Sequence, residues 1–171
     1  MLLSHAHPDH YTDVDVILDG IAERYKHAFL IAEPSCLEGE HQCVCKYMQR
    51  KVAHCIALKP NESFTLPGSE IRITATRAEH YDPCIGFFIQ GKEASIGYAS
   101  DGPYFKEQEK QFEGAGIMIF NVLVPHGHEP RERKHMSVDN VITFVDQMQR
   151  KPKLLIIQHF SFWMLRSNVA M

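Results

Sequence analysis

The sequence lacks any apolar run approaching the roughly 20 residues that a membrane-spanning helix requires. Its opening Met1-Leu2-Leu3 is too short for the apolar region of a signal peptide. We therefore expect no membrane partner and a cytoplasmic location. A large excess of charge of one sign is also missing, since the net charge is −3. General attraction to nucleic acid is not indicated, although a local basic patch could still bind it.

Cysteines are few, odd in number and irregularly spaced, and none forms a Cys-x-x-Cys pair. This pattern excludes a disulfide framework of the secreted type and predicts reduced thiols. His41 with Cys43 and Cys45 could hold a structural metal, but no second cysteine pair follows at zinc-finger spacing. We therefore favour an ordinary surface segment there. The five cysteines are Cys36, Cys43, Cys45, Cys55 and Cys84.

No repeat, low-complexity tract or linker divides the 171 residues, and 44% of them are hydrophobic. This length and composition suit one domain over residues 1–171 with one substantial core. Alternating and periodic apolar residues predict the order of its elements. We expect strands at 28–32, 54–58, 63–66, 71–76, 85–89, 94–99, 116–124 and 153–157, the last of them buried, and helices at about 14–22, 37–53, 104–112 and 137–148.

Histidine is abundant, and most of the 11 histidines fall at the ends of predicted strands. Four residues of metal-ligand type, His5, His7, Asp9 and His10, occupy six positions. Alternation along an extended segment places His5 and His7 on one side, while Asp9 and His10 follow a proline-directed turn. Two ligand pairs can therefore face two adjacent cations. Two dications about 4 Å apart commonly need a bridging carboxylate, for which Asp101 at a strand end is the candidate.

The run His5-x-His7-x-Asp9-His10, followed in order by His80, Ser100-Asp101-Gly102 and His159, resembles the successive metal motifs of the metallo-β-lactamase-fold hydrolases. The resemblance implies an α+β fold, an αββα sandwich. It also implies two divalent ions, for which we expect zinc, with manganese or iron as alternatives. One ion would be held by His5, His7 and His80, and the other by Asp9, His10 and His159, with Asp101 bridging them.

The family's first strands normally precede the histidine motif, whereas here only four residues do. We therefore expect a truncated domain that is incomplete at its amino terminus. An uncovered sheet edge or face is costly in isolation, which favours homo-oligomerisation or weak activity of the chain alone.

Within the family, the segments Tyr98-Ala99-Ser100-Asp101 and Lys134-His135-Met136-Ser137 look most like the ribonuclease Z and cyclic phosphodiesterase branches. His135 occupies the place of their additional active-site histidine, although a histidine beside a helix N-cap is the simpler alternative. The resemblance implies a metal-dependent phosphodiesterase in which a metal-bridged hydroxide attacks, Asp9 orients the water and accepts its proton, and His135 assists the leaving oxygen. Arg131, Arg133 and Lys134 could hold phosphate oxygens or simply form a solvated loop.

Two other functions stay open. The same hydroxide can attack a carbonyl, so a metal-dependent lactonase or thioesterase is the alternative enzyme. A non-catalytic binding protein that retains the metals is the alternative from another class. We favour a small-molecule or nucleotide phosphodiester as the substrate.

Overall fold

The computed structural model describes residues 1–25, 27–128 and 134–166. The chain divides into two compact units, residues 1–59 and 60–171. Each has its own sheet and its own apolar core. The single domain expected over residues 1–171 stays a prediction. Among the described residues, no helix combines the length and the hydropathy needed to cross a membrane.

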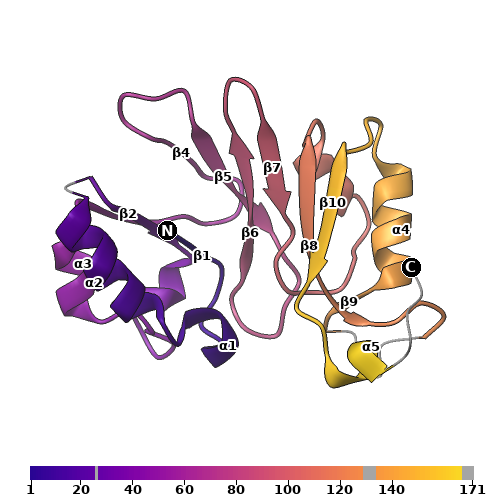
Figure 1. The fold of residues 1–171 in the computed structure, drawn as a ribbon, viewed down its shortest axis with the longest axis horizontal. Coiled ribbons are helices and arrows are strands. Elements are labelled where there is room, and N and C mark those ends of the chain that lie inside the picture. Colours follow the sequence, from indigo (N-terminus) through magenta and orange to yellow (C-terminus); the bar gives the residue numbers. More distant parts are fainter. Residues whose placement is uncertain (26, 129–133, 167–171) are drawn as a thin grey trace. The chain divides into compact units, whose positions relative to one another are not determined.

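The first unit contains a parallel sheet of three strands in the order β1-β2-β3 (Figure 1). Parallel neighbours require crossover connections, which here contain helices. Helices α2 and α3 place Leu18 and Met48 against Leu3 and Leu30 of the sheet, and this packing forms the core of the unit. The elements are β1 (Leu2–Leu3), α1 (Pro8–Tyr11), α2 (Val14–Arg24), β2 (Phe29–Ala32), the 3-10 helix η1 (Pro34–Cys36), α3 (Lys46–Lys51) and β3 (His54–Ala57).

The helix expected over 37–53 is wrong for most of its length, because only Lys46–Lys51 is helical. The chain turns back before it, and the backbone N–H groups of Cys43 and Val44 donate to the carbonyl of Cys36. This return buries Val44 completely in the core. Burial of one apolar side chain therefore overrides the helical preference of the surrounding residues.

The second unit contains a sheet whose main path runs β10-β8-β7-β6-β5-β4, with β9 paired to β8. Strands β4 to β7 are antiparallel neighbours, whereas β7, β8 and β10 run parallel. The carboxyl ends of β7, β8 and β10 therefore lie at the same edge of the sheet. These strands are β4 (Ser63–Thr65), β5 (Arg72–Arg77), β6 (Ile85–Gln90), β7 (Ser95–Tyr98), β8 (Ile117–Val124), β9 (Met136–Ser137) and β10 (Leu154–Gln158).

Helix α4 (Val138–Gln147) connects β9 to β10 and packs on the sheet (Figure 1). It begins as expected at Ser137, whose side chain accepts from the backbone of Asn140 while the Asn140 side chain accepts from the backbone of Ser137. This reciprocal pair is a capping box. Phe144 of α4 is fully buried and contacts Phe120 of β8 with ring centroids 4.9 Å apart. The short helix α5 (Phe162–Arg166) follows β10.

Two expectations for the second unit are wrong. The helix expected over 104–112 is reduced to the 3-10 helix η2 (Gln108–Phe112), because Glu107 adopts a left-handed backbone with φ 68°. The last strand, expected to be buried, is an edge strand on which Leu154 and Leu155 are 49% and 43% exposed. The expected strands are otherwise present, with bounds shifted by at most one residue at either end.

Candidate metal centre

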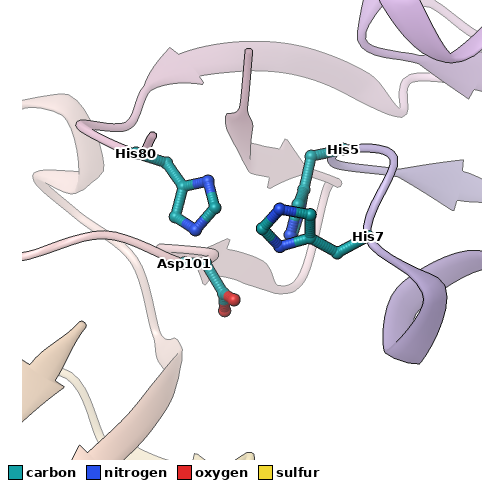
Figure 2. Close-up of side chains that lie close together, drawn as sticks. All are labelled: His5, His7, His80 and Asp101. Atoms are coloured by element: carbon teal, nitrogen blue, oxygen red, sulfur yellow. The ribbon is translucent and has the colours of Figure 1, made fainter. Parts of the chain in front are cut away.

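The first unit gathers four ligand-type side chains directly after β1. His5 is fully buried, and its ring lies beside that of His7 (Figure 2). The ring centroid of His5 lies 4.7 Å from that of His7 and 4.2 Å from that of His10. Pro8 stands at the first position of α1, where its missing N–H is no loss. This turn brings Nε2 of His10 to 3.7 Å from Oδ2 of Asp9. The four residues predicted from the run are thus close together.

In the second unit, the side chains of His80, His135 and His159 lie near the carboxylate of Asp101. Oδ2 of Asp101 lies 3.6 Å from Nδ1 of His135 and 3.9 Å from Nε2 of His159. The ring centroids of His80 and His135 are 5.7 Å apart. His80 and Asp101 face one another, with a ligand atom of each within 4.8 Å of the other (Figure 2). The sequence therefore predicted the whole group in this unit.

Left-handed backbone occurs at two positions beside these ligands. Ser100, which precedes Asp101, has φ 62°, and His159 has φ 64°. Each lies where the chain leaves a parallel strand, β7 or β10. A non-glycine residue in this conformation costs of order 1–3 kcal/mol and often marks a functional site. At Ser100 and His159 this conformation turns the chain at the sheet edge where the side chains of Asp101 and His159 lie.

Asp101 is 1% exposed, so its carboxylate depends on protein hydrogen bonds. The amide nitrogen of Asn121 donates to Oδ1 of Asp101 at 2.5 Å and also contacts the hydroxyl of Tyr98 at 3.0 Å. Burial is the main cause that raises the pKa of Tyr98, so its phenol stays neutral over the physiological range. The sequence analysis assigned no role to Asn121 or Tyr98. The available signal was a lone amide inside the apolar strand at 116–124.

The ligand-type side chains of both units are of the same two kinds, histidine and aspartate. Each side chain offers an imidazole nitrogen or a carboxylate oxygen, which suits zinc, manganese or iron. Histidine and carboxylate in these numbers fit the expected divalent ions, and the ligand-type residues are His5, His7, Asp9 and His10 in the first unit and His80, Asp101 and His159 in the second.

Two histidines in the loop that follows β8 contact residues outside this donor set. Nδ1 of His126 lies 2.6 Å from Oδ1 of Asp139, and the ring of His128 packs against Trp163. None of the five cysteines forms a disulfide, and no cysteine joins a potential metal-holding group among the described residues. Lys134 places Nζ over the ring of Tyr81 at 5.4 Å. Arg131 and Arg133 lie outside the described residues.

Sequence comparison relates the chain to a known family. Residues 1–160 match the family described as Beta-lactamase superfamily domain. A similar protein is the uncharacterized protein MJ1374 of Methanocaldococcus jannaschii, which is 31% identical over 99% of this chain and 64% of its own length. The chain thus spans less than two thirds of the length of this curated relative.

Solved structures show the same fold. The metallo-beta-lactamase fold protein YhfI from Bacillus subtilis is 18% identical, with a TM-score of 0.74 over 93% of this chain and 63% of that one. The short form of human tRNase Z is also 18% identical, with a TM-score of 0.69 over 94% of this chain and 71% of that one. The predicted α+β fold class is therefore confirmed, and the chain belongs to the metallo-β-lactamase-fold branch of the beta-lactamase superfamily.

Proposed function

We propose that this protein is a dinuclear metal-dependent hydrolase that cleaves phosphodiester bonds. The observation that carries the proposal is the buried carboxylate of Asp101, whose Oδ2 faces the imidazoles of His135 and His159. A buried carboxylate among imidazoles is a suitable ligand for a divalent metal. The ordered run from His5 to His10 supplies the remaining donors, and membership of the superfamily supports a hydrolytic metal site.

The proposed ligand assignment follows the family resemblance. His5, His7 and His80 would hold one metal and Asp9, His10 and His159 the other, with Asp101 as the ligand shared between them. We propose zinc as the metal. When bound, two dications lower the pKa of a water molecule and neutralise charge on phosphate oxygens.

We assign the proton transfers of the reaction to Asp9 and His135. The Asp9 side chain is 61% exposed on the short helix α1, which suits a carboxylate that orients a water, takes its proton and releases it to solvent. The His135 side chain is 23% exposed and its Nδ1 lies 3.6 Å from Oδ2 of Asp101, so the ring lies beside a proposed metal ligand. We assign it the proton or hydrogen bond that the departing oxygen needs.

A phosphodiester substrate is favoured over a lactone or thioester by two observations. The fold is shared with tRNase Z, and His135 stands at the place of the additional histidine of the ribonuclease Z branch that the sequence resembles. We also propose that Lys134, the residue before His135 in the sequence, pairs with a phosphate oxygen.

The test is turnover of bis-p-nitrophenyl phosphate beside a lactone and a thioester panel, with zinc supplied. We expect hydrolysis of the phosphodiester and its loss in Asp9→Asn. The matched control is Asp13→Asn, because Asp13 is exposed and makes no side-chain cap hydrogen bond to α2. Preference for the acyl substrates would replace the proposal with the alternative enzyme class. Turnover unchanged by Asp9→Asn would remove Asp9 from the mechanism.

A further inference from the structure

Asn121 lies on β8, between the two strands that lead to Asp101 and His159. In the parallel sheet, β8 pairs with β7 on one side and with β10 on the other. Gln158, the last residue of β10, is the register partner of Asn121. Asp101 comes shortly after β7, and His159 directly after β10. Asn121 is therefore placed to act on both ligand-bearing segments.

The side chain of Asn121 is hydrogen bonded at both ends and is 1% exposed. Its amide nitrogen donates to Oδ1 of Asp101 at 2.5 Å and to the hydroxyl of Tyr98 at 3.0 Å. Its carbonyl oxygen accepts from Nε2 of Gln158 at 3.0 Å. This orientation is the consistent one, because only the amide nitrogen can donate to a carboxylate.

The two oxygens of Asp101 consequently have different surroundings. Oδ1 accepts a hydrogen bond from the Asn121 amide, whereas Oδ2 lies 3.6 Å from Nδ1 of His135 and 3.9 Å from Nε2 of His159. We infer that Asn121 is a positioning residue that holds Oδ1 so that Oδ2 is presented to the metal, and that it ties the end of β10 to the same point through Gln158. This inference rests on the proposed function, in which Asp101 and His159 are ligands.

An amide is the side chain suited to this position. Aspartate would place a second carboxylate against Asp101 in a buried site, where like charges repel strongly. Leucine of similar size would leave the buried Oδ1 without its donor, and such a loss is costly. Asparagine donates to the carboxylate, adds no charge and keeps an oxygen for Gln158.

The test measures zinc affinity by competition with a chromophoric chelator on the full chain. We expect Asn121→Ala to weaken zinc binding by about tenfold or more, as loss of a ligand's hydrogen-bond partner commonly does. Asn121→Asp should weaken it further, and Gln158→Ala less. The matched control is Asn140→Ala, which removes the capping box of α4 and should leave zinc affinity unchanged.

A double-mutant cycle separates positioning from a structural role. If Asn121 acts mainly through Asp101, Asn121→Ala should cause a much smaller loss of affinity in an Asp101→Ala background, where only its hydrogen bond with Gln158 remains. An equal loss in both backgrounds, or full affinity in folded Asn121→Ala, would overturn the inference and leave the proposed function standing. If Asn121→Ala fails to fold, the test uses Gln158→Ala, which lies on the edge strand β10. Unchanged zinc affinity in Gln158→Ala would show that the hydrogen bond between Gln158 and Asn121 does not position the end of β10. A wild-type chain that binds no zinc would contradict the proposed function itself.

Discussion

Gly102 lies so close to Glu79 that a Cβ at position 102 would collide with the Glu79 carbonyl oxygen. Gly102 also has φ 139°, a conformation that side-chain-bearing residues rarely adopt. Gly102 directly follows Asp101, and Glu79 directly precedes His80. The missing side chain therefore allows the backbones that carry two predicted ligands to approach one another.

Gly102→Ala should push these two segments apart and weaken metal binding. We expect about a tenfold or greater loss of zinc affinity, measured by chelator competition, in a protein that still folds. Gly20→Ala is the control, because a Cβ there meets nothing within 4 Å and alanine stabilises a helix interior by about 1 kcal/mol. Undiminished zinc affinity in Gly102→Ala would show that the close approach does not set the ligand geometry.

His135→Ala should lower kcat while metal content stays constant. General acid catalysis contributes about 10²–10⁴-fold, and the loss should be larger for an alkyl leaving group than for p-nitrophenolate, which departs readily unaided. Steady-state kinetics on the two diesters gives the comparison. His126→Ala is the control, since His126 is 69% exposed and paired with Asp139. Equal losses on both diesters would argue that His135 does not serve the leaving oxygen.

Two half-buried thiols should differ in reactivity. A hydrogen bond with the Cys36 side chain is the main cause that lowers the pKa of Cys43, whereas burial raises the pKa of Cys55. The thiolate is the reactive form of cysteine. Below the ordinary thiol pKa, a larger fraction of Cys43 than of Cys55 is therefore thiolate. We expect iodoacetamide at about pH 7.5 to label Cys43 before Cys55, read by peptide mass spectrometry. The difference should shrink as the pH rises through both pKa values. Earlier labelling of Cys55 would contradict these environments.

The sequence predicts the strands of this fold well and points to the ligand-type residues that the structure brings together, because both are local signals. Apolar runs marked the strands, and the spacing from His5 to His10 marked the ligand run. His80 and Asp101 were found because each lies just beyond a predicted strand. These features require no knowledge of which strands are neighbours.

Features that depend on register and packing were not predicted. Asn121 is recognisable as a positioning residue only once β8 is known to lie between β7 and β10. The helix expected over 37–53 failed because burial of Val44 is a tertiary effect. The exposure of Leu154 follows from the edge position of β10, which an apolar run does not reveal.

The central claim, a dinuclear centre that depends on Asp101, is tested most directly by metal analysis. Plasma mass spectrometry of the purified chain, with size-exclusion chromatography to establish folding, should find about two metals per chain and fewer in Asp101→Ala. Asp146→Ala is the control, because Asp146 lies exposed on α4 and should keep full metal content. A folded wild-type chain without metal, or an Asp101→Ala variant that retains both, would contradict the account.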